Sequence, residues 1–140
     1  MSELKLETVK KILDAAEKKA QEIGSPSSIA VIDSGRELMG FVRMDGALLA
    51  SAEISQAKAY TARSLNGPTS AFGEYSQPGG PLYGLETAHM RAGRPLITFG
   101  GGVPLSVNGV IVGAIGVAGG TPAQDEEIAL AAAQILEASK

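Results

Sequence analysis

The chain has 140 residues, 44% of them hydrophobic, and a formal net charge of −3, so we expect a single domain over residues 1–140 with a sizeable core. Its lysines and arginines are scattered rather than clustered, which argues against binding to DNA or RNA. The absence of cysteine excludes disulfides, thiolate catalysis and thiolate-bound metal centres.

The chain begins without the apolar core of a secretion signal, and no run approaches the ~18 apolar residues of a membrane span. We therefore expect a cytoplasmic protein that does not enter membranes. Apolar residues recur at three- and four-residue spacing over residues 9–23, which predicts an amphipathic surface helix. Gly24 stands where the end of this helix favours a residue with positive φ, and Pro26 prevents its continuation.

A hairpin is predicted next. Residues 29–32 and 38–44 are short apolar strands, and residues 33–36 between them have the composition of a turn. Asp45-Gly46 ends the second strand, and an alanine-rich helix is expected over residues 49–65. The small residues of this helix indicate tight packing, within the domain or against another subunit.

A second hairpin has the stronger signal. Asn108-Gly109 separates apolar runs over residues 105–107 and 110–117, and this dipeptide fits a type I′ turn, in which both central residues have positive φ. The returning strand has almost no polar residue, so we expect it to be central and buried on both faces. Gly113 and Gly116 within it predict the close approach of another backbone, a helix or a ligand.

The remaining segments complete the order of elements. Residues 66–94 are rich in glycine and proline and predict an irregular insertion, and residues 96–99 predict a short strand. Thr121–Gln124 is a capping-box pattern at the start of a last helix that runs to about Ala138. Hairpins that alternate with helices predict an α+β domain with a largely antiparallel sheet covered by helices.

Short motifs lie along nearly the whole chain at Ser28–Leu38, Arg43–Ala47, Ala57–Ala59, Thr61–Ala62, Pro78–Gly80, Gly100–Leu105, Gly113–Gly119 and Gln124–Glu126. Taken together and in this order, they resemble the GlcG/HbpS family. The resemblance implies a profilin-like α+β fold, an antiparallel sheet flanked by helices that assembles as dimers or larger homo-oligomers. Some members of the family, including the C-terminal domain of PduO-type proteins, bind haem, and others are encoded among bacterial catabolic enzymes. The histidine-bearing N-terminal segments of haem-binding members have no counterpart here, since His89 is the only histidine.

Four polar side chains are candidates for chemistry. His89 has an ordinary pKa near neutrality, which suits a general base or an axial haem ligand, although a lone histidine also serves structural roles. Lys58 lies on a largely apolar helix, where desolvation would lower its pKa and prepare it as a base, a Schiff-base amine or a carboxylate partner. Alternatively, its stem packs on apolar surface and its head reaches water or a carboxylate. Arg43 and Asp45 leave a strand end on the same face, where they bind a ligand or pair with each other.

The glycine loops supply further ligand-binding candidates. The loop that contains Gly101 and Gly102 presents consecutive backbone N–H groups, which suit a carboxylate or a developing oxyanion. Tyr83, on a second glycine-rich loop, offers a hydroxyl, and Thr61 lies close to Lys58 on the same predicted helix. With one histidine and no cysteine, the sequence has no metal-ligand spacing, and we expect no metal site.

Two functions remain open beside a purely structural oligomer. The first is binding of haem, or of another planar or acidic metabolite, between the glycine loops and the Lys58 helix, near a subunit interface of a homo-oligomer. The second is a small catabolic tautomerase, isomerase, lyase or hydrolase that acts on an oxo or hydroxy acid by proton transfer. There Arg43 would hold a carboxylate, Lys58 or His89 would move the proton, and Gly101 and Gly102 would stabilise an enolate.

Overall fold

A four-stranded antiparallel sheet forms the centre of the computed structural model, which describes residues 3–87, 90 and 93–138. Its strands are β1 (Ser28–Asp33), β2 (Leu38–Arg43), β3 (Gly102–Val107) and β4 (Val110–Ala118). Their spatial order is β2-β1-β4-β3, so the two hairpins lie side by side and meet where β1 pairs with β4. The predicted α+β class and antiparallel sheet are confirmed.

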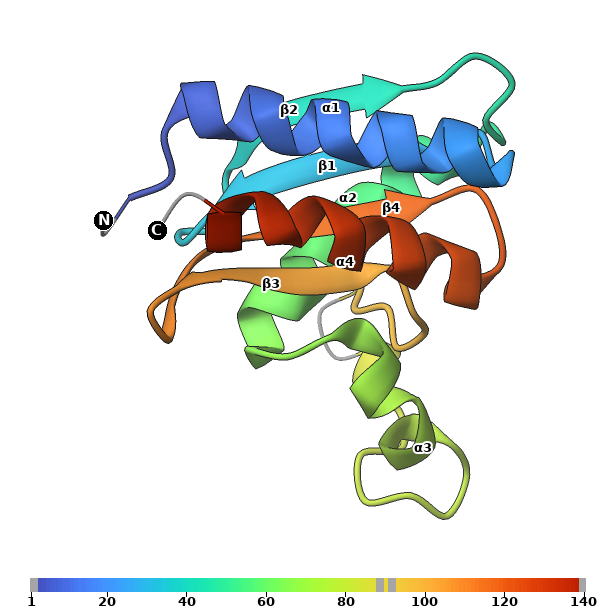
Figure 1. The fold of residues 1–140 in the computed structure, drawn as a ribbon. Coiled ribbons are helices and arrows are strands. Elements are labelled where there is room, and N and C mark those ends of the chain that lie inside the picture. The colour runs from blue at the N-terminus through green and yellow to red at the C-terminus, as the bar shows by residue number, and fades with distance from the viewer. Residues whose placement is uncertain (1–2, 88–89, 91–92, 139–140) are drawn as a thin grey trace.

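Helices cover both faces of this sheet (Figure 1). Helices α1 (Leu6–Ile23) and α4 (Pro122–Ala138) pack side by side on one face, and α2 (Ser51–Leu65) packs on the other. The central position predicted for β4 is confirmed, since it pairs with β1 and β3 and contacts both α2 and α4. The main core lies under α1 and α4, and a smaller apolar cluster beneath α2 consists of Ile32, Ala59, Ala62 and Ala114.

The local signals in the sequence correspond to the observed turns and caps. Gly24 ends α1 with φ 71°, and Asn108 and Gly109 have φ 51° and 81°, as a type I′ turn requires. In the capping box, Thr121 N donates to Gln124 Oε1 at 3.0 Å and Gln124 N donates to Thr121 Oγ1 at 3.2 Å. These features depend on residues close in sequence, which is why the pattern alone predicts them.

The glycines of β4 allow the close packing that the sequence predicted. A Cβ atom on Gly116 would overlap the carbonyl oxygen of Ser55 and lie 2.6 Å from the backbone nitrogen of Ala59, both in α2. A Cβ atom on Gly113 would overlap the carbonyl oxygen of Ile32 in the neighbouring strand. At these two positions the approaching group is therefore backbone of this chain.

The insertion between α2 and β3 consists of short helical pieces and irregular segments. It contains η1 (Thr69–Phe72), α3 (Gly73–Ser76) and η2 (Leu85–Thr87), and α3 with the loop that follows it extends away from the sheet (Figure 1). The strand predicted over residues 96–99 was wrong, because this segment has no regular secondary structure. Instead of pairing with a strand, Ile97 N donates to Thr61 Oγ1 at 2.9 Å, and Leu96 is buried.

Within the described residues, the helices are too short or too polar for any of them to cross a membrane.

Candidate functional site

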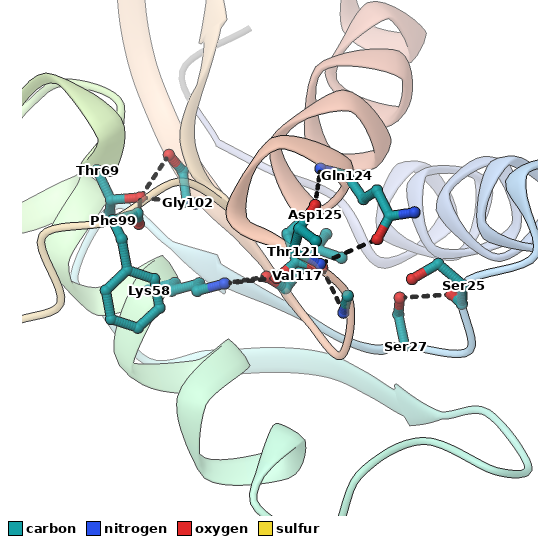
Figure 2. A network of polar contacts seen from close by, with 11 residues as sticks. Ser25, Ser27, Lys58, Thr69, Phe99, Gly102, Val117, Thr121, Gln124 and Asp125 are labelled. Carbon is teal, nitrogen blue, oxygen red and sulfur yellow. Dashed lines mark hydrogen bonds and ion pairs between the residues drawn. The ribbon is translucent and has the colours of Figure 1, made fainter.

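Lys58 is the centre of a buried polar cluster on the side of α2 that faces the sheet (Figure 2). Only 1% of its surface is exposed. Its Nζ donates to the carbonyl oxygen of Val117 at 2.8 Å and pairs with Asp125 Oδ2 at 2.9 Å. The ring of Phe99 lies 5.1 Å from Nζ. One ammonium group thus joins α2 to the end of β4 and the first turn of α4.

Asp125 completes this cluster with both of its carboxylate oxygens. While Oδ2 contacts Lys58, Oδ1 accepts a hydrogen bond from Gly120 N at 2.9 Å. Asp125 is 1% exposed, so the ion pair is almost entirely removed from water. Burial lowers the pKa of Lys58, and the hydrogen bond and negative charge of Asp125 oppose this decrease.

Gly101 and Gly102 form the wall against which Lys58 packs. Gly101 has φ 134°, and a Cβ atom there would overlap the carbonyl oxygen of Val117 and lie 2.6 Å from Lys58 Nζ. A Cβ atom on Gly102 would lie 2.7 Å from Thr69 Cγ2. Gly102 N donates to Thr69 Oγ1 at 3.0 Å. Gly101 and Gly102 thus pack directly against Lys58, where the sequence predicted a ligand between them, and the N–H of Gly102 has its acceptor within the chain.

An open pocket of about 370 Å³ lies beside α2, between the β1–β2 turn and residues 93–95. Arg36 and Arg94 line it, with their Cζ atoms 4.9 and 4.6 Å from the centroid of the Tyr60 ring. Arg36 Nη1 donates to Tyr60 Oη at 3.1 Å and to Ser64 Oγ at 3.2 Å. Arg94 Nη2 donates to the carbonyl oxygen of Arg36 at 3.2 Å. We call Arg36, Tyr60 and Arg94 the arginine–tyrosine group.

The electrostatics of this group differ from those of the Lys58 cluster. Within the described ranges, no carboxylate lies at ion-pair distance from Arg36 or Arg94. Glu53 lines the same pocket without pairing with either of them. The pocket therefore has an excess of positive charge beside an apolar wall, which is formed by Ile32, Leu38, Ala57 and Pro95.

The other predicted residues lie elsewhere. Arg43 and Asp45 are exposed at the end of β2, and both line shallow pockets of about 330 and 260 Å³ that do not include Lys58. No ion pair joins these two described side chains. Thr61 is buried, where its Oγ1 donates to the carbonyl oxygen of Ala57 at 2.7 Å, and Tyr83 is 68% exposed. His89 lies outside the described residues.

Reasoning from the sequence missed Asp125 and the whole arginine–tyrosine group. Asp125 is in the first turn of a helix, a position that favours acidic residues by the helix dipole alone. A sharper signal was a single lysine on an alanine-rich helix, because a buried ammonium needs an acidic partner somewhere in the chain. The signal for Arg36 was weaker. Arg36 is the last residue of the predicted turn over residues 33–36, and turns of this kind often contain glycine or asparagine.

Comparisons with known proteins agree on one family. Residues 4–134 match the family model described as haem degrading protein HbpS-like. The chain is 41% identical over 124 residues to an uncharacterized 15.0 kDa protein from the dhaT-dhaS intergenic region of Citrobacter freundii, covering 89% of this chain and 85% of that protein. The crystal structure of Klebsiella pneumoniae ORFY matches with a TM-score of 0.91 at 37% identity, covering 96% and 91% of the two chains. The crystal structure of a PduOC–haem complex matches with a TM-score of 0.88 at 33% identity, covering 95% and 94%.

Proposed function

This chain belongs to the HbpS-like family, and from that membership we propose that it binds haem. One observation carries the proposal, namely that the PduOC structure, similar to this chain over 95% of its length, is a haem complex. The family match over residues 4–134 extends from before α1 into α4, so it includes every strand of the sheet. The fold seen with haem in that relative is thus present here.

The described residues fit the chemical character of haem. Haem combines an apolar macrocycle with two carboxylates, and the arginine–tyrosine group offers two guanidinium groups beside an apolar wall. A volume of about 370 Å³ falls within the range of about 300–1,000 Å³ that is usual for small-molecule sites. When bound, haem supplies an iron centre for ligand binding or redox chemistry. This chain would supply guanidinium donors for the carboxylates and apolar side chains that exclude water.

His89 is the residue that we propose as the axial ligand. It is the only histidine in the chain, and a histidine holds the haem iron in globins and peroxidases. Binding near a subunit interface of a homo-oligomer also stays a prediction, which the subunit stoichiometry in solution tests.

The alternative of a proton-transferring enzyme has less support from the geometry. Lys58 is 1% exposed, and its ammonium group is already bonded to Val117 and Asp125. The N–H of Gly102 is bonded to Thr69. Both groups would have to leave these partners before they could act as the base and the oxyanion donor of an enolisation.

A haemin titration tests the proposal. Haemin is added to the purified protein, to His89→Ala and to Met90→Leu, a matched control at the next residue, and the Soret band is recorded. We expect a saturable shift at one haem per subunit in the unmodified protein and the control, with much weaker binding in His89→Ala. A saturable shift that His89→Ala leaves unchanged would support haem binding and exclude His89 as the axial ligand. The absence of any saturable shift in the unmodified protein would reject haem binding.

A further inference from the structure

We propose that the arginine–tyrosine group is a carboxylate-binding site, with Arg36 and Arg94 holding the carboxylate and the apolar wall of the pocket holding the body of the ligand. This goes beyond haem binding and does not rest on it, because the recognised group is a carboxylate on an apolar molecule. Such a carboxylate is present on haem and on free organic acids alike.

The first support is the uncompensated charge. The guanidinium carbons of Arg36 and Arg94 both lie within 5 Å of the centroid of one ring, that of Tyr60. Like charges held close together repel each other, and the negative face of a ring offsets this repulsion only in part. Among the described residues no carboxylate lies at ion-pair distance to neutralise the two positive charges. An anion bound in the pocket that both arginines line would do so.

The second support is the number of free donors. A guanidinium group carries five N–H donors in a fixed plane, which match a carboxylate in bidentate fashion. In the part of the chain that the structure describes, Arg36 bonds through Nη1 and Arg94 through Nη2. These bonds hold the two planes in place and leave donors on each for a ligand. The site is therefore preorganised, which lowers the entropic cost of binding.

The third support is the backbone of Arg36, which is independent of the side-chain contacts. Arg36 has φ 69°, a left-handed conformation that glycine or asparagine adopts at lower cost. The turn is fixed from within, since Asp33 Oδ1 accepts from Gly35 N at 2.9 Å and from Glu37 N at 3.0 Å. An arginine in this strained position directs its guanidinium group to Tyr60. Backbone strain of this kind is concentrated at functional sites.

The walls of the pocket favour a monocarboxylate over a phosphate. Ile32, Leu38, Ala57 and Pro95 offer apolar surface to the body of the ligand. Glu53 also lines the pocket, and its negative charge disfavours a dianion more than a monoanion. We therefore expect an acid with one carboxylate at the arginines and an apolar tail along the wall.

The test uses hexanoate and its neutral counterpart hexanamide, followed by ligand-observed NMR. The variants are Arg36→Gly and Arg94→Gln. Arg63→Gln is the matched control, because Arg63 lies on α2 and donates to the carbonyl oxygen of Ser34 at 2.8 Å without lining the pocket. We expect hexanoate to bind the unmodified protein and the control, and to bind at least ~10-fold more weakly to both pocket variants. Hexanamide should bind weakly to all four proteins.

A second arm compares haemin with its dimethyl ester, which lacks the carboxylates. If the pocket variants weaken hexanoate binding and leave haemin unaffected, the site takes a free acid. If they weaken haemin binding but not that of the ester, the site takes haem carboxylates. Either result supports the proposal. It is overturned if neither probe depends on the two arginines, or if hexanamide binds as tightly as hexanoate. Since hexanoate needs no haem, a failure of haem binding leaves this test intact.

Discussion

Lys58 and Tyr60, two residues apart on α2, anchor two groups of similar composition and opposite character. In each group a positive side chain lies against an aromatic ring, Lys58 against Phe99 and the two arginines against Tyr60. The Lys58 cluster is buried and contains its own counter-charge in Asp125. The arginine–tyrosine group opens into a pocket and contains none among the described side chains. If the proposed carboxylate site is correct, the location of the counter-charge, rather than the type of cation, separates the structural group from the binding site.

The energetic consequences follow from burial. Two charges removed from water lose hydration, and they recover this loss only through each other and through well-formed hydrogen bonds. Removing one member of such a pair leaves a buried charge without compensation. An arginine at the edge of a pocket keeps part of its hydration, so its removal changes the free energy of unfolding little. The contrast can therefore be tested by measuring the stability of variants in the Lys58 cluster and the ligand binding of variants in the arginine–tyrosine group.

The largest effect is expected for Asp125→Asn. The substitution removes the negative charge beside the buried Lys58 ammonium, and we expect the free energy of unfolding to fall by about 3–5 kcal/mol. Chemical denaturation measures this change. The control is Glu127→Gln in the same turn of α4, where the carboxylate makes a partly exposed ion pair with Lys19 at 3.4 Å. There we expect a loss of less than about 1 kcal/mol.

A paired substitution shows whether the charge is the cause. Lys58→Met combined with Asp125→Leu removes both charges and keeps apolar volume, so it should restore much of the stability that Asp125→Asn loses. If the double variant is less stable than Asp125→Asn, the hydrogen bonds to Val117 and Gly120 carry the stabilisation instead of the ion pair.

Gly101→Ala should have the next largest effect. The new Cβ atom would lie 2.6 Å from Lys58 Nζ in a backbone conformation of φ 134°, so both overlap and strain oppose it. We expect a loss of about 3 kcal/mol in the free energy of unfolding. Gly79→Ala is the matched control, since Gly79 has φ 90° with open space around it, and strain alone should cost about 1 kcal/mol. Equal losses at the two positions would show that neither Lys58 nor the carbonyl oxygen of Val117 requires the close approach.

The pH dependence of stability gives a smaller effect. Burial lowers the pKa of Lys58 in the folded protein below its ordinary value of 10.5. Between the lowered pKa and 10.5 the unfolded chain binds more protons at this residue, so its contribution to the free energy of unfolding rises with pH. The rise is about 1.4 kcal/mol for each unit by which the pKa is lowered. Denaturation of the unmodified protein and of Lys58→Met across alkaline pH isolates it, and parallel curves would contradict it.

Sequence reasoning succeeded where the determining residues are neighbours and failed where they are distant. The type I′ turn at Asn108-Gly109 and the capping box at Thr121 depend on a few consecutive residues. Lys58 and Asp125, in contrast, are 67 residues apart, and Arg36 and Arg94 are 58 apart. No local pattern indicates which lysine meets which carboxylate, because only the folded chain brings such distant residues into contact.

The same limit explains two details of the candidate site. The apolar run at residues 96–99 has the composition of a strand, but its polar backbone is satisfied in part by Thr61, which no strand pattern reveals. Gly101 and Gly102 pack directly on Lys58, where consecutive glycines suggested backbone donors for a ligand. Their role as a donor nest was an interpretation of the same pattern, and Thr69 occupies the N–H of Gly102.

The smallest change in stability is expected for Arg36→Gly, and it is the sharpest test of the comparison. The variant loses hydrogen bonds to Tyr60 and Ser64, which are partly buried, but it relieves a left-handed backbone that glycine adopts freely. The two effects offset, so we expect the free energy of unfolding to change by less than about 1 kcal/mol. Arg36→Ala, which loses the same bonds and keeps the strain, should be less stable than Arg36→Gly by about 1 kcal/mol. A loss above about 2 kcal/mol in Arg36→Gly would make Arg36 a structural residue like Lys58, and the contrast between the two groups would fail.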